Sequence, residues 1–286
     1  MAHTPRNESE KATLAARRAW CYLVLVFFSF LCLFFFYILV INSTRTHFEI
    51  QKGFSLLPGK SLVTNFKNVL ADANIPVLTG IRNSLIVSAC SAALSVYFSA
   101  LTAYGIYAYN FKFKKAAFAI ILLIMTMPTQ VSALGFLQLI TKMGLKNSFI
   151  PLIVPSIAAP AVFFFMKQYL DASLPMEIVE AARMDGAGPM RFFFTILMPL
   201  SLTNIAAMFV IQFIYGWNQY LWPLLVTTSE DMYPIVIGIK RMIGGGDSAN
   251  EWNLIMATAM LAMIPPAIVV TVMQRWFVKG LVDTEK

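Results

Sequence analysis

The chain has 286 residues, of which 58% are hydrophobic and 13% charged, and its formal net charge is +8. Together with a mean hydropathy of +0.70, this composition excludes an ordinary soluble domain and is typical of a protein that lies in a lipid bilayer. Because no basic face interleaved with aromatic residues accompanies the positive charge, we do not expect nucleic acid as a partner.

Six segments free of Asp, Glu, Lys and Arg predict an all-α, polytopic membrane protein with six transmembrane helices. About 20 helical residues cross the hydrocarbon core, and each segment is long enough. The fifth is longer than one span needs, so we expect Pro199 to separate a lead-in from a membrane helix that ends near Leu224. The segments are residues 19–44, 83–111, 116–141, 147–166, 192–229 and 252–274.

The predicted organisation follows from these spans. It comprises a tail (1–18), a first transmembrane helix (19–41), an external segment (42–82), a core of five spans (83–278) and a C-terminal tail (279–286). An even number of spans places both termini on one side. Basic residues near span ends, above all Arg17, Arg18 and the cluster at residues 112–115, predict that this side is the cytoplasm. The apolar run after Arg18 is too long for a signal-peptide core, so we expect a retained anchor.

The second predicted span carries small hydroxyl residues at intervals of three and four. That spacing places them on one helical face, which favours close helix packing. The same face could instead line a water-filled pathway through the membrane. These residues are Ser84, Ser88, Ser91, Ser95, Ser99 and Thr102.

A polar motif separates the fourth and fifth predicted spans. It reads Glu180-Ala181-Ala182-Arg183-Met184-Asp185-Gly186 and is followed by Ile196-Leu197-Met198-Pro199. The pattern predicts a short amphipathic helix that Gly186 ends in a left-handed conformation.

The residues around the motif predict how its two helices begin. We expect Ser173 to cap the first helix with Pro175 in its first turn, and Ala181 and Ala182 to leave it a narrow flank. Gly188 and Pro189 are expected to begin a second helix that carries the phenylalanines at 192–194 back to the membrane.

This pattern resembles the cytoplasmic signature of permease subunits in binding-protein-dependent ABC importers, with Met198 where that family usually has Leu. The resemblance implies a type I ABC importer transmembrane domain with coupling helices over residues 175–196. The alternative is an interfacial amphipathic helix without a partner. The residues implied to couple to an ATPase are Glu180, Ala181, Ala182, Arg183, Asp185 and Gly186.

The same resemblance implies an assembly. Two ATPase subunits would hold ATP and Mg, and a second, related permease would form a heterodimer with this chain in the membrane lipid. An extracytoplasmic solute-binding protein would dock on the external segments 42–82 and 227–251. Residues 213–225, Glu251-Trp252-Asn253 and the segment 274–283 resemble, within the carbohydrate-uptake group, permeases that import glycerol-3-phosphate.

Three consecutive residues are candidates for the solute pathway. Asn218 and Gln219 are costly to leave facing lipid, because their amide donors and acceptors would be unpaired. We therefore expect Asn218, Gln219 and Tyr220 to face the solute or the partner permease. For Trp217, Tyr220 and Trp222, anchoring in the headgroup zone is the alternative.

The spans hold no ionisable residue at mid-depth, which disfavours an ion-coupled secondary carrier. No catalytic constellation or metal-ligand spacing occurs, and the three cysteines (Cys21, Cys32 and Cys90) fall in or beside spans. The run from Gly53 to Gly59-Lys60-Ser61 has five residues between its glycines, where a phosphate-binding loop needs four. We therefore predict no catalytic residues and no metal or cofactor site in this chain.

We expect a permease subunit in a bacterial inner membrane. It would pass glycerol-3-phosphate, or a related polyol phosphate or sugar, from a binding protein to the cytoplasm by alternating access. The alternatives are an oligosaccharide ABC importer permease, a secondary carrier, a polytopic membrane enzyme and a structural scaffold.

Overall fold

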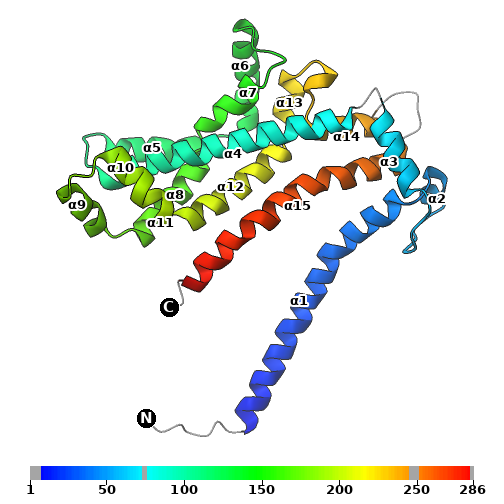
Figure 1. The fold of residues 1–286 in the computed structure, drawn as a ribbon, viewed down its shortest axis with the longest axis horizontal. Coiled ribbons are helices and arrows are strands. Elements are labelled where there is room, and N and C mark those ends of the chain that lie inside the picture. The colour runs from blue at the N-terminus through cyan, green and yellow to red at the C-terminus, as the bar shows by residue number, and fades with distance from the viewer. Residues whose placement is uncertain (1–7, 73–75, 245–250, 284–286) are drawn as a thin grey trace. The chain divides into compact units, whose positions relative to one another are not determined.

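The computed structural model describes residues 8–72, 76–244 and 251–283, and the regular elements within them are helices (Figure 1). In chain order they are α1 (Glu8–Ser43), α2 (His47–Gln51), α3 (Leu62–Ala71), α4 (Val77–Ala108), α5 (Lys114–Met125), α6 (Thr129–Lys142), α7 (Ile150–Ile153), η1 (Val154–Ile157), α8 (Pro160–Ser173), α9 (Met176–Met184), α10 (Pro189–Phe192), η2 (Phe193–Leu197), α11 (Met198–Leu200), α12 (Leu202–Trp217), α13 (Leu221–Val226), η3 (Glu230–Met232), α14 (Ile235–Gly244) and α15 (Trp252–Asp283).

Four helical segments of the described chain are long and apolar enough to cross a membrane by themselves. They are Thr13–Ser43, Val77–Ala108, Ile150–Ser173 and Trp252–Trp276. Two further helix pairs pass the same criterion together but are bent: Lys114–Met125 with Gln130–Lys142 by 99°, and Pro189–Leu200 with Leu202–Trp217 by 80°. Counting each pair as one span gives the six that the sequence predicts, two of them broken.

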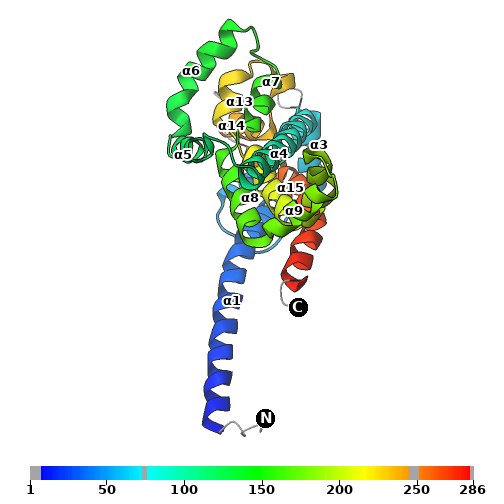
Figure 2. The same ribbon diagram turned by 90° about the vertical axis from the view of Figure 1, so that its left-hand side faces the viewer.

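The first bent pair joins α5 and α6 at Pro128. Figure 2 shows the two helices meeting at a steep angle. Pro128 has an extended backbone (φ −62°, ψ 125°) and is the N-cap of α6. Its ring disfavours a helical conformation at the residue before it, so the apolar run 116–141 does not form one straight helix.

The second bend differs from its prediction. The break falls at Ser201, which is the C-cap of α11, and not at Pro199, which lies in the first turn of that helix. Pro199 lies inside the helical run Pro189–Leu200, just after the π-helical turn Phe193–Leu197, and does not end that run. The membrane helix α12 ends at Trp217 and not near Leu224. Both the backbone N–H and the side-chain Nδ2 of Asn218 donate to the Ile214 carbonyl, at 3.1 and 2.9 Å, and this closes the helix.

The segment 1–18, which the sequence assigns to a tail, contains the start of the first helix. Helix α1 begins at Glu8, so the expected tail of residues 1–18 is helical from that residue onward. The stretch from Glu8 to Arg18 is rich in Glu, Lys, Ala, Leu and Arg, which are strong helix formers. The helix therefore extends beyond the apolar run.

The chain divides into two compact units, residues 1–69 with 248–260 and residues 70–247 with 261–286. In the first unit, Asn65 is 2% exposed, and its Nδ2 donates to the carbonyls of Ser43 and Arg45 at 2.8 and 2.9 Å. Asn253 Nδ2 donates to Asn65 Oδ1 at 2.9 Å. These bonds join the end of α1 to α3 and to the first turn of α15. Most side chains of α1 itself are exposed, as expected for a helix that faces lipid.

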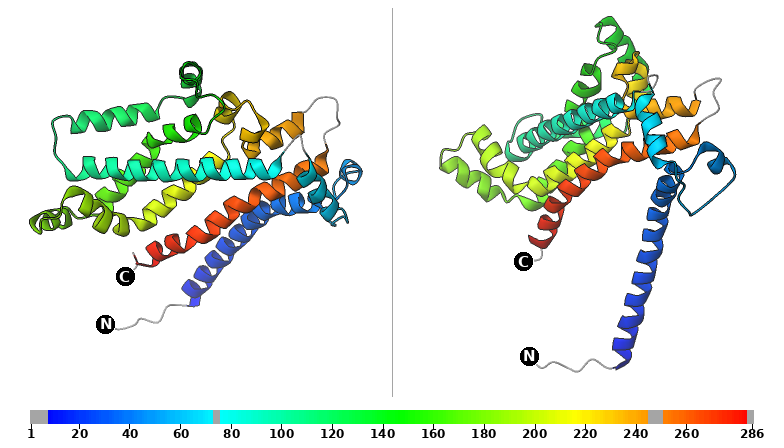
Figure 3. Two further views of the ribbon diagram at one scale, coloured as in Figure 1. Left: turned by 45° about the horizontal axis from the view of Figure 1, so that its top comes forward. Right: turned by 45° about the vertical axis from the view of Figure 1, so that its right-hand side comes forward.

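The second unit is built around α4. Helices α8 and α12 pack along it, and the views in Figures 1 and 3 agree on this arrangement. A Cβ added at Gly216 of α12 would lie 3.2 Å from Ser88 Cα, which shows how closely the two backbones approach.

The hydroxyl face of α4 is a packing face. Ser84, Ser88, Ser95 and Ser99 are at most 3% exposed. Ser95 Oγ donates to the Ser156 carbonyl at 2.8 Å, and Ser84 Oγ accepts from the Ile235 N–H at 2.9 Å. The serines therefore hold α4 against η1 and the start of α14, as the packing interpretation predicts. Thr102 is exposed and bonds within its own helix, to the Phe98 carbonyl.

Candidate functional site

The Glu-Ala-Ala motif forms α9, which we call the motif helix (Met176–Met184). Its N-cap is Pro175, with φ −61° and ψ 138°, and no side chain caps it. The predicted Ser173 cap is wrong. Helix α8 continues through Ser173, and the Leu174 N–H bonds to the Leu170 carbonyl at 3.0 Å. Glu177 lies in the first turn of the motif helix, where the helix dipole favours an acidic side chain.

The end of the motif helix agrees with the sequence prediction. Gly186 has φ +76°, in the left-handed region that favours glycine. Its N–H bonds to the Arg183 carbonyl at 3.0 Å, and the Ala187 N–H bonds to the Ala182 carbonyl at 2.9 Å. This pair of bonds is the Schellman arrangement that stops a helix sharply. Gly188 then caps α10, with Pro189 in its first turn.

The motif helix has a buried and an exposed face. Val179 and Ala182 are 0% and 7% exposed and pack in the core of the second unit. Ala182 therefore does not form part of an open flank, whereas Ala181 does. The exposed face carries Met184, which is 89% exposed, with Glu180, Ala181, Asp185 and Gly186.

Arg183 joins the motif helix to the C-terminal end of α4. Its Nη2 donates to the carbonyl of Ala108, the last residue of α4, at 2.7 Å. Its guanidinium carbon lies 4.7 Å from the centre of the Tyr109 ring. Arg183 is exposed, and within this chain its guanidinium contacts a neighbouring helix; the predicted contact with an ATPase stays a prediction.

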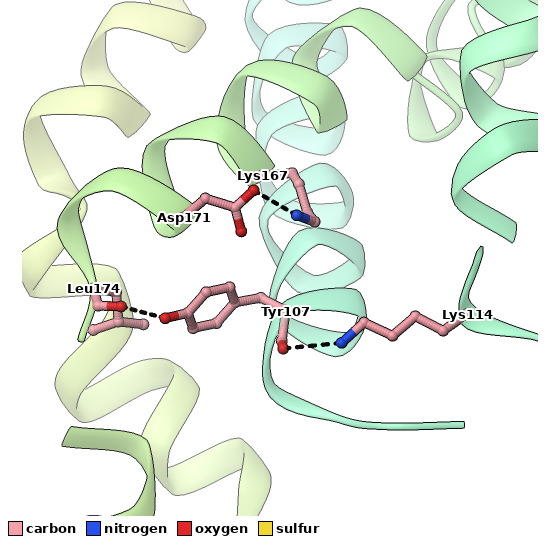
Figure 4. A network of polar contacts seen from close by, with 5 residues as sticks. All are labelled: Tyr107, Lys114, Lys167, Asp171 and Leu174. Carbon is pink, nitrogen blue, oxygen red and sulfur yellow. Dashed lines mark hydrogen bonds and ion pairs between the residues drawn. The ribbon is translucent and has the colours of Figure 1, made fainter. Parts of the chain in front are cut away.

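Tyr107 makes a second connection between α4 and the motif helix, at the N-terminal end of the motif helix. Its hydroxyl donates to the Leu174 carbonyl, just before the motif helix begins (Figure 4). The backbone carbonyl of Tyr107 accepts from Lys114 Nζ at 3.4 Å, and nearby in α8 Lys167 pairs with Asp171 at 2.5 Å. Sequence reasoning missed Tyr107, because one tyrosine among many near span ends gives no distinctive pattern.

The segment after the motif helix is also fixed to α4. Tyr104 stacks on Phe192, with ring centres 5.4 Å apart and an interplanar angle of 18°. Phe193 is 0% exposed and meets Tyr97 edge to face at 6.0 Å. Phe194 is 51% exposed. Two of the three phenylalanines thus anchor the segment in the protein core.

The candidate pathway residues lie in the break between α12 and α13. Asn218 is exposed, while Gln219 and Tyr220 are half-buried. Trp217 is only 5% exposed and stacks on Phe213 at 5.8 Å, so within this subunit it is a core residue and not a headgroup anchor.

A polar cluster around Asn147, near the break between α12 and α13, was not identified from the sequence. Asn147 has φ +57°. Its Oδ1 accepts from the N–H groups of Thr228 and Ser229 at 3.0 and 3.1 Å, and its Nδ2 donates to Ser229 Oγ at 2.8 Å. It connects the loop before α7 to the loop after α13. Asparagine tolerates left-handed backbone, but the sequence does not reveal which distant loop it binds.

No group of three or more His, Cys, Asp or Glu residues is placed to hold a metal ion within the ranges 8–72, 76–244 and 251–283.

The fold has solved relatives. A chain in the crystal structure of a bacterial ABC transporter involved in the import of the acidic polysaccharide alginate aligns with a TM-score of 0.78 at 20% sequence identity, over 96% of this chain and 100% of that one. A second alginate ABC transporter structure, in complex with a periplasmic protein bound to an alginate pentasaccharide, aligns with a TM-score of 0.59 at 17% identity. It covers 90% of this chain and 93% of that chain. The chain thus shares its fold with chains of these solved ABC transporters.

Sequence comparison gives the family. Residues 95–283 match the family described as the binding-protein-dependent transport system inner membrane component. The sn-glycerol-3-phosphate transport system permease protein UgpE of Agrobacterium fabrum is 42% identical over 257 residues, 88% of this chain and 90% of that protein. UgpE of Yersinia pestis is 37% identical over 272 residues, 93% and 96% of the two chains. The chain therefore belongs to this family and is a non-catalytic, multi-pass inner-membrane permease of a binding-protein-dependent ABC importer.

Proposed function

We propose that this subunit imports sn-glycerol-3-phosphate, or a closely related polyol phosphate, through alternating access driven by ATP hydrolysis in partner subunits. The observation that supports the proposed substrate is the 42% identity to UgpE of Agrobacterium fabrum over 88% of this chain. ATP and Mg are held by two ATPase subunits, and a second, related permease completes the pathway.

The geometry of the second unit supports this division of labour. Helix α4 has 32 residues and is therefore about 48 Å long at 1.5 Å per residue. The motif helix is bonded to Ala108 at one end of α4, whereas Ile235 is bonded to Ser84 near the other end. A coupling site and an external entrance at opposite ends of one membrane-spanning helix match what an importer requires.

We further propose that both termini are cytoplasmic, which places the motif helix in the cytoplasm. Its exposed residues Glu180, Ala181, Asp185 and Gly186 contact an ATPase subunit, and Asn218, Gln219 and Tyr220 contact the solute. The binding protein docks on residues 42–82 and 227–251. Residues 73–75 and 245–250 of these segments lie outside the described residues.

Uptake by the whole importer tests this function. A bacterial strain without glycerol-3-phosphate transport should take up the radiolabelled solute when it expresses this permease with its genomic partner subunits. Uptake should stop when the ATPase is omitted, but should persist when an ionophore collapses the proton gradient while ATP is maintained.

Competing unlabelled solutes define the specificity. Excess unlabelled glycerol-3-phosphate should abolish the uptake of label, and maltose-type oligosaccharides should leave it unchanged. Oligosaccharide uptake without glycerol-3-phosphate uptake would replace the proposed substrate. Uptake that needs an ion gradient and no ATPase would contradict the proposed mechanism.

A further inference from the structure

We propose that Arg183 is a positioning residue that fixes the motif helix to the C-terminal end of α4, so that displacement of the motif helix is delivered to α4 first. The inference rests on the proposed coupling of the motif helix to an ATPase. It differs from that proposal because it assigns Arg183 to a connection inside the chain and not to the contact with the partner.

The chemistry of the contact favours a strong connection. The last carbonyls of a helix lack intrahelical partners and form the negative end of the helix dipole. The Arg183 guanidinium donates a charge-assisted hydrogen bond to one of them, the Ala108 carbonyl, at 2.7 Å. The Tyr109 ring lies 4.7 Å from the same guanidinium, which adds a cation–π attraction and limits its rotation.

The motif helix is connected to α4 at more than one point. The Tyr107 hydroxyl binds the Leu174 carbonyl ahead of the helix, as Figure 4 shows, and Arg183 binds Ala108 from its last turn. Phe192 stacks on Tyr104 beyond it. A helix attached at a single point pivots, whereas contacts before, within and after it make it move with its neighbour.

The other route from the motif helix into the membrane is less direct. Towards α12 the chain passes through the π-helical turn Phe193–Leu197 and then a bend of 80°. π-Helical turns are local irregularities that are often found at functional sites. Helix α4, by contrast, runs without interruption from Val77 to Ala108. The stiffer path from the motif helix therefore leads through Arg183 into α4.

The test is Arg183→Met in the complete importer, since methionine keeps an apolar side chain of similar reach but removes all donors and the charge. We expect the ATPase to copurify with the complex and to hydrolyse ATP. The number of solute molecules transported per ATP should fall by about tenfold, the size expected for losing one charge-assisted hydrogen bond. Arg183→Lys, which keeps the charge and a donor, should restore part of this ratio. An unchanged ratio in Arg183→Met would overturn the inference.

Two matched variants exclude a general effect of charge. Lys114→Met removes the cation that bonds to the Tyr107 carbonyl, at the same end of α4, but leaves the motif helix attached. Arg191→Met removes an exposed cation in α10. Both should keep the native ratio of transport to hydrolysis. A fall in Lys114→Met equal to that in Arg183→Met would show that Arg183 only caps α4, and would also overturn the inference.

A distance measurement tests the same point without depending on the stability of Arg183→Met. Spin labels are placed on Glu177→Cys in the motif helix and Lys112→Cys just beyond α4, after the three native cysteines are replaced by serine. We expect one narrow distance that does not change when ATP binds to the complex, and a broadened distribution in Arg183→Met. A distance that shifts on ATP binding in the otherwise native chain would show that the two helices move independently. If instead no ATPase copurified with the native complex, the proposed function would fail before this inference was tested.

Discussion

At the scale of single residues, the motif helix depends on one backbone conformation. Gly186 at φ +76° donates one of the two hydrogen bonds that end the helix, the Ala187 N–H next to it donates the other, and the chain turns there towards α10. Gly188, two residues later, has an ordinary φ of −67°. The two glycines stand in open space, since nothing lies within 4 Å of a Cβ added at either. Any difference between their substitutions therefore reports backbone strain and not steric overlap.

We predict that Gly186→Ala lowers solute uptake while Gly188→Ala does not. A non-glycine residue in the left-handed region costs about 1–2 kcal/mol, so the chain relieves the strain by changing the direction in which the motif helix ends. The measurement is uptake by cells that hold equal amounts of assembled complex. Equal activity of the two variants would show that this turn does not need to be fixed.

A second residue-scale prediction concerns the candidate pathway. Replacing Asn218 and Gln219 together by Leu should lower uptake without disturbing assembly, because the amides that would bind hydroxyl or phosphate oxygens are lost. Gln168→Leu, which removes an exposed amide from α8, is the control. The initial uptake rate is measured over a range of solute concentrations. Native rates in the double variant would remove these residues from the pathway.

At the scale of elements, α12 lies against α4 because both helices present small residues at the contact. We predict that Gly216→Ala lowers the thermal stability of the purified complex, since the new Cβ would lie 3.2 Å from Ser88 Cα. Overpacking of this kind costs about 1–3 kcal/mol. Gly105→Ala in α4 is the matched control, because nothing lies within 4 Å of its added Cβ. Equal melting temperatures for the two variants would contradict the close packing.

The loops around the pathway break give a further prediction. Asn147→Gly keeps the left-handed backbone accessible but removes the acceptor for two N–H groups, those of Thr228 and Ser229. Hydrogen exchange at these two amides should therefore accelerate. The Thr227 amide, which bonds to the Pro223 carbonyl, serves as an internal control and should be unchanged. Unchanged exchange at Thr228 and Ser229 would show that Asn147 does not hold this loop.

These elements also show what a sequence can and cannot predict. Apolar length predicted the spans, and glycine after an amphipathic helix predicted the turn at Gly186, because both depend on local chemistry. The break at Ser201 and the burial of Ala182 depend on which helices lie alongside, and a single sequence does not show this directly. For the same reason the direction of Arg183 was missed: its partner, Ala108, is a backbone carbonyl far away in the chain.

At the scale of the whole molecule, the proposed function requires that the motif helix and the loop after α13 lie on opposite sides of the membrane. The second unit separates them along α4, with the motif helix at Ala108 and α14 near Ser84. Ala108 lies 24 positions after Ser84 in one continuous helix, a rise of about 36 Å. That length exceeds the hydrocarbon thickness of about 30 Å. If α4 crosses the membrane, the motif helix and the loop after α13 therefore lie on opposite sides.

Cysteine labelling of intact cells tests this arrangement. After the three native cysteines are replaced by serine, we expect Asp231→Cys to react with a membrane-impermeant maleimide in intact spheroplasts. Met184→Cys, at a position that is 89% exposed in the isolated chain, should react only after the membrane is permeabilised. Each variant is the control for the other, since equal labelling of both variants in intact spheroplasts would indicate that the membrane leaks. Labelling of Met184→Cys from outside, with Asp231→Cys protected, would invert the orientation and leave the motif helix out of reach of any cytoplasmic ATPase.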